Sequence, residues 1–175
     1  MQAVVDFWTR AGMERWFGKD EAFDADIRQR FLDLHLAVAA RRHDDWLESP
    51  EGALALLILT DQFPRNAFRG TAHMYATDPL ARHFARRALA QGFMDRVDPQ
   101  LRVFLCLPFT HSEDLVDQDL GVELNLPLGG TTLEFARHHR DIIRRFGRFP
   151  HRNRLLGRHS TPEEEEFLAT GGFSG

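Results

Sequence analysis

The chain has 175 residues, a formal net charge of −4, and 43% apolar and 11% aromatic residues. This length fits one domain, and the apolar content excludes a disordered protein, which would be poor in hydrophobic residues. Because Cys106 is the only cysteine, an intramolecular disulfide and a cysteine-based zinc site are also excluded.

The N-terminal residues carry no sorting signal that we recognise. Met1–Asp6 lacks a basic region followed by an apolar stretch, so no signal peptide is predicted. The longest apolar run, Ala53–Leu59, is too short to span a bilayer. We therefore expect a cytoplasmic protein without a membrane partner.

The first two predicted elements are helices. Apolar residues from Val4 onward predict a short helix ending near Gly12. Asp20 is a favourable N-cap for the next helix. Residues that recur at every fourth position then share one face of this helix, namely Phe23, Ile27, Phe31 and His35.

Later helix starts repeat one signal, a capping residue followed by proline. This signal occurs at Ser49-Pro50, Asp78-Pro79 and Asp98-Pro99, and the last two helices are expected to end near Gly92 and before Pro108. Farther along, a capping box at Thr131–Glu134 predicts a helix that ends at Gly147, and Thr161–Glu164 opens the last helix.

No alternating pattern is long enough to indicate a β-strand. We predict an all-α fold of about eight helices, arranged as successive antiparallel hairpins in a single domain spanning residues 1–175. The loops between the expected helices are short, and no linker rich in Pro, Gly or Ser divides the chain.

Three loop-like segments concentrate polar side chains. The first follows the most apolar helix, which Pro64 is expected to end near Phe63. Ends of buried elements often carry functional residues. The candidates at this helix end are Asp61, Gln62, Arg65 and Asn66.

The second segment is Leu107–Asp114. Pro108 is expected to stop a helix and Ser112 to cap the next one, which places His111 at a helix N-terminus. The positive end of that helix would disfavour a charged imidazolium. Glu113 lies beside it and is the acidic candidate of this segment.

The third segment runs from His138 to Asn153. Its first part is helical by spacing and includes Arg140, and Gly147 and Pro150 indicate a turn. The candidates around and after that turn are Arg148, His151, Arg152 and Asn153. Residues 137–158 hold eight arginines and one acid, giving +7 there and −11 over the rest of the chain.

The three segments read "DQFPRN", "LPFTHSEDL" and "HRDIIRRFGRFPHRN", with "DFW" near the start. In this order they resemble a bacterial family of unknown function with a TPR-like, all-helical fold. The resemblance implies a TPR-like array of helical hairpins for nearly the whole chain. It implies no reaction, because no activity is established for the family.

Our leading hypothesis is a pocket for a small anionic ligand formed by all three segments. Arg65, Arg148 and Arg152 could hold a phosphate or carboxylate through bidentate hydrogen bonds, with Asn66 and Asn153 orienting it. The alternative is that these arginines pair with acids of the same chain, since buried arginines must be paired. The candidate acids are Asp61, Glu113 and Asp141.

Two further hypotheses stay open. A hydrolase or transferase would use His111 or His151 as the acid or base, Glu113 or Asp61 as the orienting carboxylate, and Arg65 with Arg148 as charge stabilisers. A protein- or peptide-interaction module would use a concave TPR-like face. The sequence identifies no metal ligands, cofactor or oligomeric state, and its pI of about 6.1 argues against nucleic-acid binding.

Overall fold

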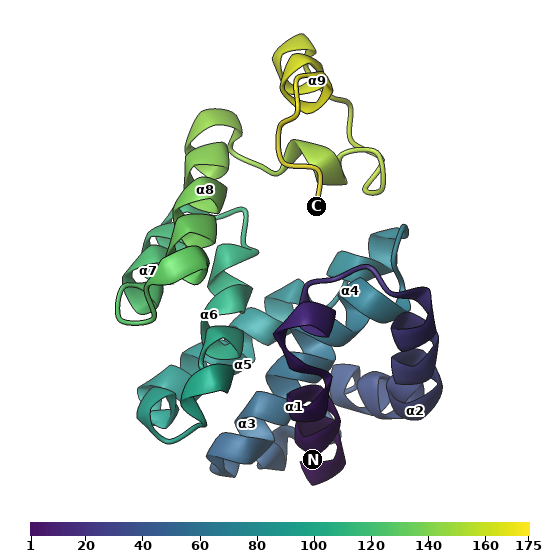
Figure 1. The fold of residues 1–175 in the computed structure, drawn as a ribbon, viewed down its shortest axis with the longest axis vertical. Helices are drawn as coiled ribbons and strands as arrows, with labels where there is room; N and C mark the ends of the chain where they lie inside the picture. The colour runs from purple at the N-terminus through teal and green to yellow at the C-terminus, as the bar shows by residue number, and fades with distance from the viewer. The chain divides into compact units, whose positions relative to one another are not determined.

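A computed structural model describes residues 1–175, and every regular element in it is a helix (Figure 1). The all-α prediction is therefore confirmed. Nine α-helices are present, α1 (Gln2–Trp16), α2 (Glu21–Ala39), α3 (Pro50–Leu57), α4 (Phe63–Ala67), α5 (Asp78–Ala90), α6 (Val103–Thr110), α7 (Leu115–Asn125), α8 (Gly130–Phe146) and α9 (Pro162–Ala169). The shorter elements are a π-helical turn at Ile58–Gln62 and 3-10 turns at Asp44–Glu48, Ala72–Tyr75, Phe93–Asp95, Pro99–Leu101 and Pro150–Arg152.

The chain forms two compact units, unit 1 (Met1–Pro108) and unit 2 (Phe109–Gly175), which we describe separately. No helix in the chain combines the length and apolar character needed to cross a membrane. The single-domain expectation stays a prediction, because two compact units can still unfold as one cooperative domain. The TPR-like arrangement of the hairpins also stays a prediction.

Several helix starts follow the predicted capping chemistry. The Asp20 carboxylate accepts hydrogen bonds from the backbone N–H groups of Ala22 and Phe23, so it caps α2. The Ser49 hydroxyl accepts from the Gly52 N–H at 3.1 Å and caps α3. Both caps satisfy N–H groups that have no partner within the helix.

Several predicted helix termini differ from the structure. Helix α6 passes through Pro108, which was expected to stop it, and ends at Thr110, because the packing of the buried residues around the proline overrides the local preference. The N-cap of α5 is Thr77 and not Asp78.

Helix α1 continues past Gly12 to Trp16, with a kink at that glycine, where φ is 73° and ψ is 173°. Glycine tolerates this backbone conformation, so the chain bends without ending the helix. Helix α8 begins at Gly130, before the predicted capping box at Thr131–Glu134. Its N-cap is Gly129, which has no side chain to cap the helix.

Aromatic packing holds the start of the chain to unit 1. Trp8 is fully buried, and its ring meets the ring of Phe104 edge-on at 5.8 Å. The Trp16 indole N–H donates to the carbonyl of Trp8 at 2.7 Å, across the kink in α1. The two tryptophans therefore serve as core residues that fasten α1.

The prediction that Pro64 ends a helix near Phe63 is wrong. Helices α3 and α4 form one continuous rod from Pro50 to Ala67, interrupted only by the π-turn. In that turn the Phe63 N–H donates to the carbonyl of Ile58, five residues earlier. A proline ring inside an α-helix clashes with the carbonyl four residues before it, and a widened turn relieves that clash.

The π-turn leaves backbone carbonyls that the rod itself cannot satisfy. Pro64 has no N–H, so it can donate neither to Thr60, four residues earlier, nor to Leu59, five residues earlier. Side chains from other elements take over. His35 on α2 donates through Nδ1–H to Leu59 O at 2.9 Å, and the Thr77 hydroxyl donates to Thr60 O at 2.6 Å.

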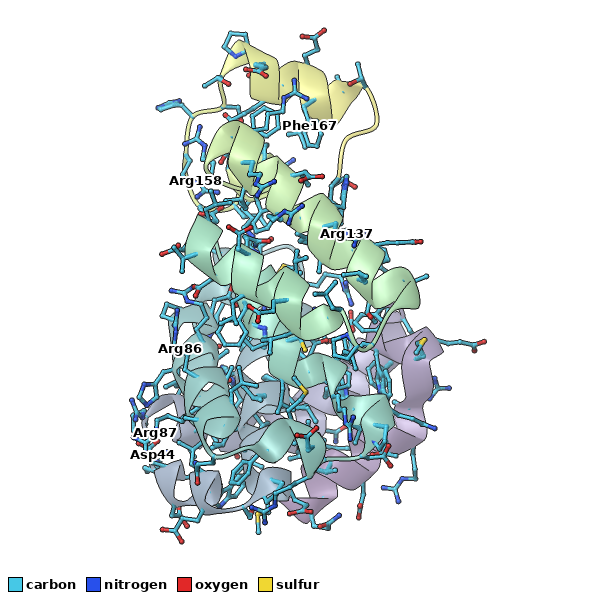
Figure 2. The ribbon with its side chains drawn as sticks, turned by 90° about the vertical axis from the view of Figure 1, so that its left-hand side faces the viewer. Asp44, Arg86, Arg87, Arg137, Arg158 and Phe167 are labelled. Atoms are coloured by element: carbon cyan, nitrogen blue, oxygen red, sulfur yellow. The ribbon has the colours of Figure 1, made fainter.

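In unit 2, helices α7 and α8 lie side by side and antiparallel (Figures 1 and 2). Its buried hydrophobic residues include Ile142, Ile143 and Phe149. Phe167 of α9 points toward the end of α8 in Figure 2, where its ring lies 5.0 Å from that of Phe146. Helix α9 is therefore attached to unit 2 by aromatic contact.

We predict that His35→Leu lowers the free energy of unfolding by about 2 kcal/mol, the typical cost of leaving a buried acceptor without its donor. The acceptor here is Leu59 O, and His35 is fully buried beside it. Urea unfolding monitored by circular dichroism would measure the loss. His83→Leu at an exposed position of α5 is the control, expected within about 0.5 kcal/mol of wild type. Equal effects at both positions would contradict the role assigned to His35.

Candidate functional site

The four candidates of the first polar segment are tied into unit 1. Asp61, Gln62 and Asn66 are buried, with 1%, 4% and 5% of their surface exposed. Arg65 binds Asp78 through two hydrogen bonds of 2.9 and 3.1 Å, and it also donates to the backbone carbonyl of Asp61 at 2.6 Å. The arginine thus joins the π-turn to the start of α5.

Burial alone would lower the pKa of Arg65, but the charges of Asp61 and Asp78 outweigh it and raise the pKa. The guanidinium is therefore a permanent partner for both acids. Asn66 donates to Asp24 of α2 at 2.8 Å. The Gln62 amide donates to the carboxylate of Asp61. For this segment, the structure therefore places a carboxylate beside each of its three candidate ligand-binding donors.

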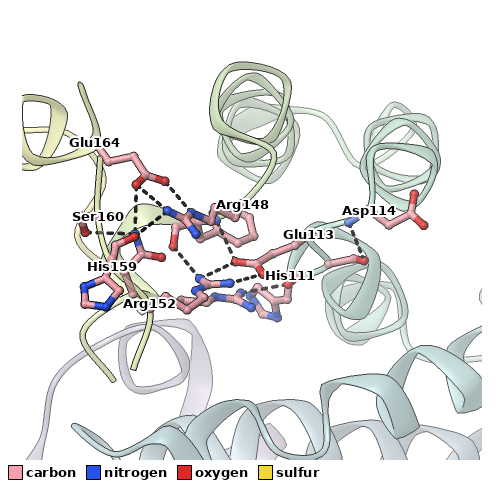
Figure 3. Close-up of polar contacts among 12 residues, drawn as sticks. His111, Glu113, Asp114, Arg148, Arg152, His159, Ser160 and Glu164 are labelled. Carbon is pink, nitrogen blue, oxygen red and sulfur yellow. Dashed lines mark hydrogen bonds and ion pairs between the residues drawn. The ribbon is translucent and has the colours of Figure 1, made fainter. Parts of the chain in front are cut away.

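The second and third polar segments meet within unit 2. Glu113 accepts hydrogen bonds from Arg158 at 2.7 and 3.0 Å and from the backbone N–H of Phe149 at 2.8 Å (Figure 3). Arg152 donates to the carbonyl of His111 at 2.9 Å. These bonds fasten the loop before α7 to the turn after α8.

A second carboxylate organises the end of the chain. Glu164 accepts from Arg148 at 2.7 and 2.8 Å and from the Thr161 N–H at 2.8 Å (Figure 3). The amide of Asn153 reaches both Glu164, at 3.3 Å, and the hydroxyl of Ser160, at 3.1 Å. Thr161 in turn caps α9 through the Glu164 N–H, which completes a capping box.

We call the residues of these two clusters, together with His151, whose ring packs against Phe149, the unit 2 network. It comprises His111, Glu113, Arg148, His151, Arg152, Asn153, Arg158, Ser160 and Glu164. Six of them were predicted as site residues. Arg158, Ser160 and Glu164 were not. The acidic run Glu163–Glu166 indicated only a favourable helix start, and no local pattern distinguishes the one acid that turns inward.

The network has a positive electrostatic character. The hydrogen bond from Arg148 is the main cause that lowers the pKa of Glu164 to about 2. Burial by itself would raise the pKa of Glu113, but bonds from Arg158 and the Phe149 N–H, together with the charge of Arg152, lower it. Both acids therefore stay ionised well below neutral pH.

A third histidine, His139, lies beside the two that belong to this network. The rings of His111 and His139 lie 6.3 Å apart, and His151 packs against Phe149 at 5.6 Å. His139 is 7% exposed and donates through Nδ1–H to the carbonyl of Phe135 at 2.8 Å. Burial, reinforced by the nearby charge of His111, lowers the pKa of His139 to about 3, so its ring is neutral at pH 7.

The turn that carries His111 is fixed by buried polar groups. Ser112 was predicted to cap the next helix, but the N-cap of α7 is Asp114. The Ser112 hydroxyl instead donates to Asp117 at 2.7 Å, and the Gln118 amide donates to the carbonyl of Ser112 at 2.6 Å. These bonds hold the His111–Glu113 segment in place.

Arg140 lies away from the Glu113 and Glu164 clusters. Its contacts run along the α7–α8 hairpin, to Asp119 at 3.8 Å and to Asp141 at 3.6 Å. The chain contains no group of three or more His, Cys, Asp or Glu side chains placed to hold a metal ion. The pocket predicted from all three segments together stays a prediction.

The signature of a family described as "Bacterial protein of unknown function (DUF924)" matches residues 4–172. The chain belongs to this family. A solved structure of a protein of unknown function from Agrobacterium tumefaciens is 56% identical, covers 97% of both chains and gives a TM-score of 0.95. None of the curated proteins matches the chain.

The match over residues 4–172 confirms the family that the sequence motifs resembled. The family and the similar Agrobacterium protein are both of unknown function, so neither supplies a reaction or a ligand. The roles of the network residues therefore depend on their chemistry in this chain.

We predict that Glu113→Gln lowers the free energy of unfolding by about 2 kcal/mol, because hydrogen bonds to charged groups contribute about 1.5–3 kcal/mol. The glutamine amide is uncharged and has one oxygen, so it cannot replace the carboxylate as the acceptor of both bonds from Arg158. Glu123→Gln, at an exposed position of α7, is the matched control and should be neutral. If both variants unfold at the same urea concentration as wild type, Glu113 does not organise the network.

We predict that His139→Gln weakens the loss of stability on acidification. The folded pKa of His139, about 3, lies below its ordinary value of 6.5, so the unfolded chain takes up the proton first as pH falls. Stability present above pH 6.5 is then lost toward pH 3, by at most about 1.4 kcal/mol per pH unit. Urea unfolding at pH 7, 6 and 5 would measure the slope. The exposed His159→Gln control should keep the wild-type slope, and a wild-type slope in His139→Gln would refute the assignment.

Proposed function

We propose that the protein binds a small anionic ligand, bearing a phosphate or carboxylate, at the unit 2 network. The observation that carries the proposal is the gathering of Arg148, Arg152 and Arg158 around Glu113 and Glu164. Three guanidinium groups face two carboxylates, which gives a net positive charge and hence a positive potential there. Such a potential attracts anions and strengthens charge-assisted hydrogen bonds to them.

Arg148 is the residue best placed to meet a ligand from solvent. Its side chain is 28% exposed, and it donates to Glu164 and to the carbonyl of His159 through Nε and Nη2. A guanidinium carries five N–H donors, so the Nη1 group is available for a further acceptor. One ligand oxygen bound there would leave the structural ion pair to Glu164 intact.

Two buried polar atoms of the network also support binding. The Oδ1 atom of Asn153 and the Nε atom of Arg158 are buried and have no hydrogen-bond partner within the chain. The two residues are held close together, since the Arg158 N–H donates to the carbonyl of Asn153 at 2.9 Å. One is an acceptor and the other a donor, a combination that a hydroxyl group or a water molecule can satisfy.

The same residues support a second proposal, a hydrolase or transferase acting on the bound anion. His111 or His151 would carry the proton, and Arg148 would stabilise developing charge. Glu113 already accepts hydrogen bonds from Arg158 and Phe149, so an orienting role would compete with them. Release of phosphate from added phosphate esters distinguishes this proposal from binding alone.

We also infer, from the sequence resemblance, that the helical hairpins follow a TPR-like arrangement and that the protein is cytoplasmic. The anion proposal does not depend on either inference. A protein or peptide partner that offers a carboxylate would use the same network chemistry.

We predict that phosphate or small carboxylates raise the melting temperature of the protein, and that Arg148→Met abolishes the rise. A ligand at 100 times its Kd stabilises the folded state by about 2.7 kcal/mol. Differential scanning fluorimetry at matched ionic strength would measure the shift. Arg154→Met, at an exposed position six residues farther along, is the control and should respond like wild type. Absence of any anion-dependent shift in the wild type would sink the proposal.

A further inference from the structure

The C-terminal segment Gly171–Gly175 places one aromatic ring among three histidines. The Phe173 ring lies 4.6 Å from the ring of His139, 5.0 Å from that of His151 and 5.9 Å from that of His138. All three contacts are edge-on, with interplanar angles of 62°, 83° and 77°. We call these three side chains the histidine cradle.

The backbone turn after α9 is built to deliver this ring. Gly171 has φ +88°, a conformation that disfavours other residues, and the Gly172 N–H donates to the carbonyl of Phe167 at 2.8 Å. A Cβ atom on Gly172 would collide with that carbonyl oxygen. Two glycines are therefore required for the chain to turn back toward α8.

Beyond this turn the segment lies at the surface. The hydrogen bond from Gly172 holds its start, Ser174 and Gly175 are exposed, and Gly175 lies against the His151 ring. Phe173 is only partly buried, whereas Ile142, Ile143 and Phe149 form the fully buried cluster beneath it. The ring packs on the edge of that cluster and is not part of its buried centre.

We propose that Phe173 is a displaceable plug, and that the ligand of the unit 2 network carries an aromatic ring which takes its place in the histidine cradle. This inference rests on the proposed function, because the anionic group of the same ligand would bind the network. The chemical class is an aryl phosphate or an arene carboxylate.

The histidine cradle, which would hold the ring of such a ligand, adjoins the network that would hold its anionic group. The cradle and the network share His151, and Phe149 links them, because its ring contacts His139 at 5.4 Å and the Arg152 guanidinium at 4.5 Å. An edge-on cradle of imidazoles accepts any planar ring, since aromatic pairs favour this arrangement. The anionic substituent would then point toward the arginines.

The test compares the binding of phenyl phosphate, benzoate, inorganic phosphate and acetate by isothermal titration calorimetry. A plug that occupies the site lowers the apparent affinity of a competing ring, so Phe173→Ala should tighten phenyl phosphate and benzoate by roughly 5-fold or more. Inorganic phosphate and acetate should bind Phe173→Ala as they bind wild type. Phe17→Ala, which removes an exposed ring from unit 1, is the control and should change none of the four.

The outcomes separate the two proposals. Wild type that binds inorganic phosphate, with no gain for phenyl phosphate in Phe173→Ala, overturns the plug but keeps the anion site. No binding of any of the four anions to either protein overturns the proposed function and the plug with it. Should Phe173→Ala fail to fold, NMR on the wild type decides. Loss of the contact between the Phe173 and His151 rings on addition of phenyl phosphate supports displacement, and its persistence at saturation overturns it.

Discussion

The buried rod from Pro50 to Ala67 imposes a strict requirement on unit 1, because its backbone carbonyls near Pro64 need donors that the rod cannot supply. Buried carbonyls without partners are costly, so the surrounding elements must provide side-chain donors. His35 from α2 and Thr77 from the start of α5 do so. These two hydrogen bonds fix which residues of α2 and of the start of α5 lie against the rod.

This requirement explains why the "DQFPRN" segment is so polar at the end of the most apolar helix. Asp61 lies in the π-turn and Arg65 follows it, and the arginine reaches both the Asp61 carbonyl and Asp78. Charge in this place therefore has a structural use, whatever ligand the protein binds. A π-helical turn is often found at functional sites, but here its hydrogen bonds are already a sufficient reason for the residues around it.

The polar residues of unit 2 have a different role, because they hold loops together and do not satisfy the carbonyls of a helix. Glu113 and Glu164 each anchor one arginine and one loop, while Arg152 lies over the Phe149 ring. Ion pairs of this kind position groups more than they stabilise the fold. The network is consequently held by specific charge-assisted hydrogen bonds and is rich in donors.

The sequence alone determined the helical class and the helix starts whose caps depend on local bonds, such as those at Asp20 and Ser49. Capping needs only residues two or three positions apart, so a linear pattern contains the information. It also brought six network residues together as candidates from two motifs. Only the tertiary structure decided that the rod passes through Pro64 and that Phe173 enters the histidine cradle. It also decided that Asp78 pairs with Arg65 and that Arg158 pairs with Glu113. Those contacts join residues 13 to 45 positions apart, or depend on a turn whose destination is set by packing, and no local spacing encodes them.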